Sequence, residues 1–115
     1  MRKENRLTGS RSFDYLYKRG AVYKNHLLVL YVAKSKFSLP KVGFSVGKKV
    51  GGSVLRNRTK RRLKEGFRLE LDRVAKGYNY VVVARSGSAE RSYAELKEAM
   101  ISLLYQAGKY TPREE

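Results

Sequence analysis

Hydrophobic residues recur along the chain with two different spacings, and together they predict four strands and three helices. Alternating or continuous apolar runs are typical of strands, whereas apolar residues three or four positions apart are typical of amphipathic helices. The strands are expected at "AVYKN" (21–25), Leu27–Ala33, Lys41–Val46 and "YNYVVVAR" (78–85). The helices are expected at Ser10–Arg19, from Ser53 to about Val74, and from Ser92 to Gly108.

Helix signals support these boundaries. Ser10 is a candidate N-cap of the first helix, and Gly20 is its expected stop. Ser92 and Glu95 have the spacing of a capping box, in which each side chain bonds the other residue's backbone N–H. Gly77 is the expected stop signal after the middle helix, and Gly108 is the expected stop of the last helix.

The order of elements predicts an α+β fold, written α-β-β-β-α-β-α, as a two-layer sandwich of helices on a sheet. The connections are short, as compact domains require. Residues 1–9 are expected to form an extended basic arm, and residues 109–115 a frayed tail. No internal repeat or linker divides the chain, so residues 1–115 are predicted to form a single domain with one modest core.

The long middle helix contains the run "VLRNRTKRRLKEGF" (54–67), in which six of the nine residues 56–64 are basic and none is acidic. On a helical wheel, a stripe that includes Thr59, Leu63 and Phe67 faces one way and is expected to pack on the sheet. The same stripe is expected to include Leu55, Leu71 and Val74. An adjacent arc collects Asn57, Lys60, Arg61, Lys64 and Arg68, while Arg58 and Arg62 fall on the remaining side.

The charge of the whole chain favours a polyanionic partner. It has 26 Lys and Arg against 10 Asp and Glu, a formal net charge of +16, far more than solubility needs. Like charges four residues apart also destabilise an isolated helix. Phosphates would compensate the basic run and could approach the N-terminus of the helix and the preceding "GKKVGG" loop. Asn57 adds an amide that can bond a 2′-hydroxyl or a base edge.

Three aromatic residues are candidates for stacking on single-stranded RNA. Phe13 and Tyr17 share one face of the first helix, and Tyr31 lies on the second strand. An aromatic side chain beside basic groups contributes about 1–3 kcal/mol per stacked base.

The sequence lacks the residues that several classes of catalytic or metal site require. There is no cysteine, and His26 is the only histidine, so neither a two-histidine nuclease nor a thiolate metal site is possible. No acidic pair lies in an apolar strand, and "GKKVGG" lacks the P-loop spacing. We therefore expect no catalytic residue and no metal ligands on the polypeptide. With no apolar stretch of about 20 residues and no secretory signal, the chain is expected to be cytoplasmic and not bound to a membrane.

Composition leaves alternatives open. A structural ribosomal protein fits the basic arm and small α+β domain equally well, and a membrane-active or DNA-binding basic helix is a third interpretation. The mixed strands and Asn57 argue against the third.

The segment "KKVGGSVLRNRTKRRLKEGFR" (48–68) resembles the RNR signature of the bacterial ribonuclease P protein subunit. The likeness extends to "NRL" (5–7), "FDYLY" (13–17), "KVGFSVGKKVG" (41–51) and "YVVVAR" (80–85). This chain departs from the usual pattern in having Ser53 for Ala, Lys64 where Arg is more common and Gly47 where Ser is frequent. Because Lys64 is not Arg, its phosphate contact would lack the bidentate fork.

The resemblance implies a fold similar to the second domain of ribosomal protein S5, with a left-handed β-α-β crossover through the basic helix. It also implies two RNA partners, the catalytic ribonuclease P RNA and precursor tRNA, with no obligate protein partner. The RNA would remove the 5′ leader to form the mature tRNA end, and Mg²⁺ would act through the RNA. The implied leader-binding residues are Phe13, Tyr17 and Tyr31. The implied contacts to the catalytic RNA are Lys48, Lys49, Arg56, Asn57, Arg58, Lys60, Arg61, Lys64 and Arg68.

Overall fold

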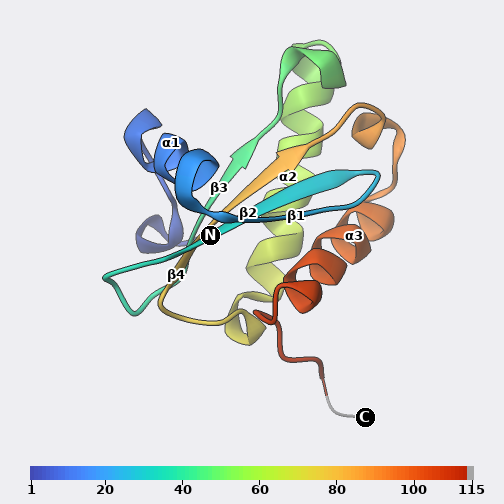
Figure 1. Ribbon diagram of the computed structural model, residues 1–115. Coiled ribbons are helices and arrows are strands. Elements are labelled where there is room, and N and C mark those ends of the chain that lie inside the picture. Colours follow the sequence, from blue (N-terminus) through green and yellow to red (C-terminus); the bar gives the residue numbers. More distant parts are fainter. Residues whose placement is uncertain (114–115) are drawn as a thin grey trace.

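Within residues 1–113, which the computed structural model describes, the elements follow the predicted order (Figure 1). The helices are α1 (Ser10–Arg19), α2 (Ser53–Leu69) and α3 (Tyr93–Gln106). The strands are β1 (Ala21–Lys24), β2 (Leu28–Lys34), β3 (Lys41–Ser45) and β4 (Tyr78–Ala84). The α+β class is therefore confirmed, and each strand boundary lies within one residue or so of the predicted one.

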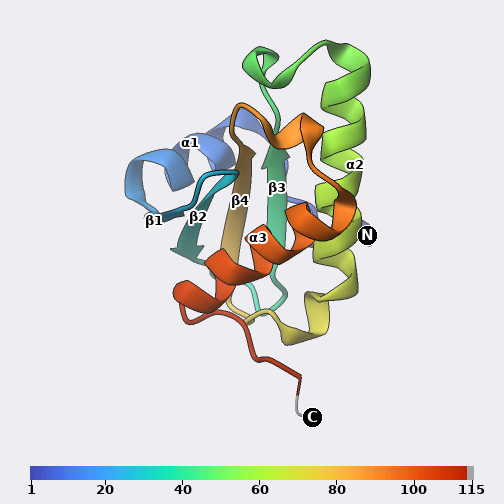
Figure 2. The same ribbon diagram turned by 90° about the vertical axis from the view of Figure 1, so that its right-hand side faces the viewer.

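The four strands form one sheet in the order β1-β2-β4-β3. The β1–β2 and β2–β4 pairs are antiparallel, while β3 and β4 are parallel. As a result β1, β3 and β4 run in the same direction, and their carboxyl ends meet at one edge of the sheet. In Figure 2, with α3 toward the viewer, β3 and β4 both run upward and β4 lies to the left of β3. The crossover through α2 is therefore left-handed, against the usual rule for such units.

The two faces of the sheet are covered unequally. Helices α2 and α3 pack on one face, where Leu30, Tyr80 and Val82 are fully buried in the main core. Helix α1 lies on the other face, where a smaller cluster forms around Leu16 and Val81 (Figure 2). The main layer of helices is thus α2 and α3, and α1 covers only part of the opposite face. That partial cover leaves part of this face exposed, including Val22 of β1.

Helix α2 is shorter than the sequence predicts, because it ends at Leu69 rather than near Val74. A 3₁₀ turn, η3 (Leu71–Arg73), follows, and Val74 then forms an isolated bridge with Tyr110. Val74 is buried, but its backbone is extended. It is therefore not part of the helical stripe of Phe67, although its spacing in the sequence suggested that it was. Leu55, also expected in the stripe, is 38% exposed.

Both ends of the chain are tied to the fold. In the predicted arm, the amide of Asn5 donates to the Pro40 carbonyl at 2.9 Å, and the Leu7 N–H donates to the Val42 carbonyl at 3.0 Å. The arm therefore lies along the outer edge of β3. The segment predicted to fray is held, as far as residue 113, by bonds from Tyr110 and Arg113 to Glu70. Positions 114 and 115 lie outside the described residues.

The helix-capping expectations differ in outcome. Ser92 and Glu95 form the predicted capping box at the start of α3. At α1 the N-cap is Gly9, with φ at +89°, and Ser10 is the first helical residue. The left-handed backbone at Gly9 turns the arm into the helix without a side-chain cap. Among residues 1–113, no helix is both long and apolar enough to span a membrane.

Candidate nucleic-acid interface

The buried face of α2 fixes the direction of its basic face. Thr59, Leu63 and Phe67 are buried, as the helical wheel predicts. The centroid of the Phe67 ring lies 6.0 Å from that of Phe44 and 5.9 Å from that of Tyr80. Because these contacts fix the rotation of α2, its polar arc is directed away from the core. The predicted sorting of the helix is therefore correct over Thr59–Phe67.

Two arginines of α2 are anchored to the segment before α3. The Arg58 guanidinium donates to the Ala89 carbonyl at 3.3 Å, and that of Arg62 donates to the Arg91 carbonyl at 2.7 Å. Both keep their charge, since carbonyls are neutral acceptors, but their side chains are held toward the protein. Arg58, predicted to bind RNA, therefore has a structural contact of its own.

Arg68, another predicted RNA contact, is paired within its own helix. Its guanidinium donates to both oxygens of Glu65, at 2.9 and 2.6 Å. This hydrogen bond is the main reason that the pKa of the Glu65 carboxyl is lowered. The pair offsets the charge of Arg68, so this end of the helix is less cationic than the sequence suggests.

The remaining polar residues predicted on this surface have free side chains. No hydrogen bond or ion pair within residues 1–113 engages the side chains of Lys48, Lys49, Asn57, Lys60, Arg61 and Lys64. Lys48 and Lys49 are exposed in a 3₁₀ turn, η2 (Lys48–Val50), just before α2. Arg56 is half-buried, and its Nε is a buried donor without an acceptor in the described part of the chain. These donors form a cationic surface able to bind an anion.

The three predicted aromatic residues come together on the opposite face of the sheet. The ring of Tyr17 lies 6.4 Å from that of Phe13 and 4.9 Å from that of Tyr31, both in edge-on geometry. The Phe13 ring also lies against the backbone of Gly43, where an added Cβ would stand only 2.2 Å from Cζ. The absence of a side chain on β3 therefore lets the first helix lie close to the sheet.

Strand pairing reveals cleft residues that sequence reasoning missed. Val29 pairs with Val83, two residues along each strand from the Tyr31–Val81 pair, and the Leu30–Val82 pair between them belongs to the main core. Both valines point to the same face as Tyr31 and are only half-buried, so they form an apolar floor next to Tyr31, against which the Tyr17 ring packs. The alternation of side chains along each strand predicts which face each valine occupies. Only the pairing register of β2 with β4, which the sequence does not specify, shows that Val29 and Val83 lie side by side. We call Phe13, Tyr17, Val29, Tyr31 and Val83 the aromatic cleft.

A shallow pocket of about 210 Å³ joins the aromatic cleft to the basic face of α2. Phe13 and Gly43 line its side toward α1, and Lys60 and Lys64 line its side toward α2. Arg6 and Thr8 of the arm complete the wall. The two predicted surfaces therefore meet at the outer edge of β3, where one nucleic-acid strand could contact both.

The side chains of a type that can bind metal ions are dispersed. Within residues 1–113, no three His, Asp or Glu side chains lie close enough together to hold a metal ion. His26 is exposed at the turn between β1 and β2, and it lines a pocket together with Glu95 and Glu98 of α3.

Comparisons with known proteins point to one family. The family model for Ribonuclease P matches residues 1–108. The chain is 47% identical over 109 residues to a ribonuclease P protein component of Clostridium botulinum, covering 94% of this chain and 98% of that protein. Its structure is similar to the Staphylococcus aureus RNase P protein, with a TM-score of 0.86 at 26% identity, covering 93% of this chain and 98% of the other. The Thermotoga maritima protein is similar with a TM-score of 0.81 at 28% identity, covering 88% and 96%.

Proposed function

Since the chain belongs to the ribonuclease P protein family, we propose that it binds the catalytic ribonuclease P RNA and the 5′ leader of precursor tRNA. It thereby assists endonucleolytic removal of the leader to form the mature 5′ end. The chemistry belongs to the RNA. The basic face of α2 and the aromatic cleft would then have separate roles.

The basic face of α2, with η2, is the proposed contact to the catalytic RNA. Its free donors are Lys48, Lys49, Asn57, Lys60, Arg61 and Lys64, and Arg56 adds a donor that lacks an acceptor. A structured RNA presents phosphates at many orientations, and lysines on a helix surface can reach them without a fixed fork geometry. Asn57 is the one neutral member, able to bond a 2′-hydroxyl among the phosphate contacts.

The aromatic cleft is the proposed site for the leader. Single-stranded RNA exposes its bases, and edge-on Tyr17 and Tyr31 above an apolar floor offer faces on which bases can stack. The single observation that carries the proposal is the pocket at β3, which Phe13, Lys60 and Lys64 all line. This shared pocket would let the protein hold a leader next to the RNA that cleaves it.

The cations of α2 also suggest how the protein assists Mg²⁺ chemistry indirectly. Phosphate groups of the RNA and the leader repel one another when they are brought together at the cleavage site. Lysine and arginine side chains reduce this repulsion, so less Mg²⁺ is needed for the same assembly. No residue of the chain is assigned a catalytic role, and Mg²⁺ is proposed to bind the RNA.

Reconstitution tests this function. Full-length protein, a catalytic ribonuclease P RNA and precursor tRNA would be combined at low Mg²⁺, with each component also tested alone. We expect cleavage at the mature 5′ end only when RNA and protein are both present. Cleavage by the protein alone after removal of RNA would overturn the proposal, as would a failure to stimulate the RNA. Sequencing the RNA that co-purifies would show ribosomal RNA if the ribosomal interpretation were correct.

Two variants test the division into two surfaces. Lys60→Ala should weaken binding of the catalytic RNA and reduce the salt dependence by about one unit of slope. Tyr17→Ala should reduce the preference for substrates with a leader, by roughly 1–3 kcal/mol, and leave binding of leaderless tRNA nearly unchanged. Tyr105→Ala, which removes an exposed tyrosine from α3, is the matched control. If the Lys60 and Tyr17 variants behave alike, the two surfaces are not distinct.

A further inference from the structure

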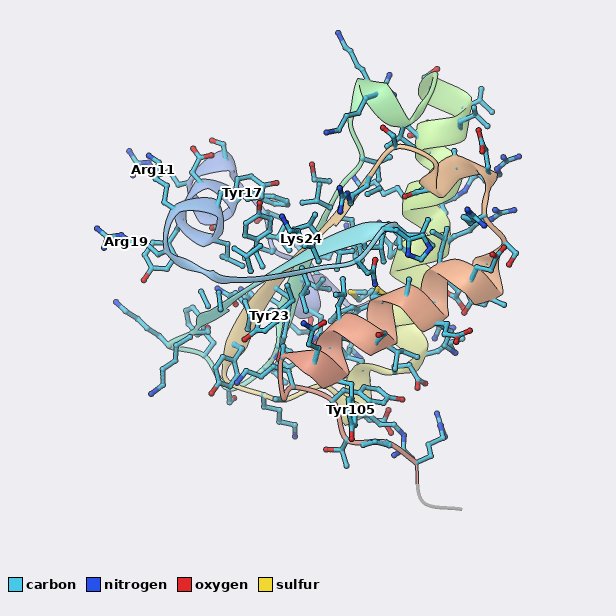
Figure 3. The ribbon with its side chains drawn as sticks, turned by 45° about the vertical axis from the view of Figure 1, so that its right-hand side comes forward. Arg11, Tyr17, Arg19, Tyr23, Lys24 and Tyr105 are labelled. Carbon is cyan, nitrogen blue, oxygen red and sulfur yellow. The ribbon has the colours of Figure 1, made fainter. Side chains whose placement is uncertain are left out.

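Lys24, the last residue of β1, lies beside the aromatic cleft but outside every motif that the sequence singled out. Its neighbour Tyr23 packs against the main core, on the side of α3. Because side chains alternate along a strand, Lys24 points to the other face, the side of Tyr17. Figure 3 shows this arrangement, with Tyr23 and Lys24 on opposite sides of the β1 ribbon. Lys24 is exposed, and its ammonium has no partner in residues 1–113.

The strand register places Lys24 at the end of a row that crosses the sheet. Lys24 pairs with Val29, Val29 with Val83, and Val83 with Ser45. Three strand spacings of about 4.8 Å make this row roughly 14 Å wide. Its middle is the half-buried valine floor of the cleft, and Lys48 and Lys49 follow Ser45 closely at the far end.

One side of the row is closed, and the β1 side is open. Toward the amino ends of β3 and β4, Leu7 and Leu16 close the sheet face over Val81. Toward β1 the face is uncovered, and Val22 on this strand is 51% exposed. A strand of RNA that enters beside Lys48 and lies on the valine floor would therefore leave across β2 and β1, past Lys24.

The backbone at Lys24 is held in place by the turn that follows. The Asn25 side-chain carbonyl accepts from the N–H groups of Leu27 and Leu28, and its amide donates to the Ala99 carbonyl of α3. The Arg85 guanidinium donates to the Asn25 backbone carbonyl at 2.7 Å. Because the turn is fixed by α3 and β4, little backbone freedom would be lost when Lys24 binds an anion.

We propose that Lys24 binds a phosphate of the leader at the β1 side of the aromatic cleft and directs the leader across the strands of the sheet. This inference rests on the proposed function, because it requires the leader to occupy the cleft. It adds a positioning residue and a direction: from Lys48 in η2, just beyond the end of β3, over Val83 and Val29, to Lys24. Only leaders long enough to cross the row gain this contact.

The test measures binding of precursor tRNAs with successively longer leaders to holoenzymes carrying Lys24→Ala, Lys24→Arg or Lys36→Ala. Lys24→Ala should lower affinity roughly twofold to fivefold, only for leaders beyond a threshold length. For those leaders it should also reduce the salt slope by about 0.7. Lys24→Arg should retain the long-leader advantage. Lys36→Ala is the matched control, since Lys36 is an exposed lysine beyond the opposite end of β2.

Equal loss of affinity at every leader length, or an equal effect of Lys36→Ala, would overturn the inference, because either would show a general charge effect. Tyr31→Ala separates this failure from failure of the proposed function. If Tyr31→Ala abolishes the leader preference and Lys24→Ala does not change it, the leader binds the cleft but does not pass Lys24. If neither variant changes it, the leader does not use the cleft.

Discussion

Gly43 on β3 controls how closely the first helix approaches the sheet. The Phe13 ring occupies the space that a side chain would fill at this position. Phe13 in turn contacts Tyr17, which contacts Tyr31, so the position of one ring affects all three. The preference of strands for larger residues is therefore overridden at Gly43 by a tertiary contact.

Gly43→Ala should destabilise the protein by roughly 1–3 kcal/mol, although alanine is normally the better residue within a strand. The new Cβ would displace the Phe13 ring and, through it, Tyr17. We therefore also expect a weaker preference for precursor tRNA with a leader. Urea unfolding and leader-dependent binding measure the two effects.

A second substitution separates stability from binding. Phe13→Leu in the Gly43→Ala background removes the ring that clashes, so it should recover much of the lost stability. The leader preference should stay low, because an aromatic face is missing. Full recovery of both quantities would show that Phe13 contributes packing alone.

At the scale of single elements, α2 has three kinds of cation rather than one. Arg58 and Arg62 are directed toward the segment before α3 by backbone carbonyls, Arg68 is paired with Glu65, and Lys60 and Lys64 are free to bind. The helical wheel cannot make these distinctions, because they depend on what lies next to each side chain. They predict unequal contributions to RNA binding from residues of equal charge.

Glu65→Gln should strengthen binding of the catalytic RNA, roughly twofold to fivefold at low salt, because it releases Arg68 for a phosphate contact. The gain should disappear in the double variant Glu65→Gln, Arg68→Ala, as filter binding across a salt series would show. Glu98→Gln, which neutralises an exposed carboxylate on α3, controls for the change in net charge. An equal gain from Glu98→Gln would mean that Arg68 has no specific role.

The sequence predicted the buried stripe of α2 correctly over Thr59–Phe67, whereas Leu55, in the first turn of the helix, is 38% exposed. Thr59, Leu63 and Phe67 obey the 100° rule and are buried. Leu71 and Val74 lie in a 3₁₀ turn and an extended bridge, where that rule no longer applies. Strong local signals also predicted the α3 capping box, whereas the bond from the arm to Pro40 depends on residues 35 positions apart and has no local signal.

At the scale of the whole molecule, the charge of +16 was visible in the sequence, but its organisation was not. Net charge predicted a polyanionic partner. The left-handed crossover then places the basic helix beside β3, at the opposite end of the sheet order from β1. The aromatic cleft became complete only when strand register brought Val29 and Val83 beside Tyr31. Composition thus predicts the class of ligand, whereas topology determines where the basic face of α2 and the aromatic cleft lie relative to each other.

Glu70 joins three parts of the molecule that are far apart in sequence. It lies just after α2, is only 5% exposed, accepts hydrogen bonds from Tyr110 and Arg113 of the tail, and lies 4.0 Å from the Lys97 ammonium of α3. Burial alone would raise the pKa of the Glu70 carboxyl, but these hydrogen bonds and cations outweigh it and the pKa is lowered. The ionised form is therefore the one that the fold stabilises.

This shift predicts the acid sensitivity of the protein. Because the pKa of Glu70 is lower in the folded than in the unfolded state, its stabilisation is present above its ordinary value of 4.5 and is lost as the pH falls through the folded value. Glu70→Gln should cost about 1–3 kcal/mol at neutral pH, since Tyr110 and Arg113 lose a charged acceptor. The difference from the unmodified protein in free energy of unfolding should then shrink below about pH 4.5. Urea unfolding from pH 7 to pH 3, with Glu98→Gln as the exposed control, measures this. A difference that stays constant with pH would show that the Glu70 carboxylate is not what holds the tail to α2.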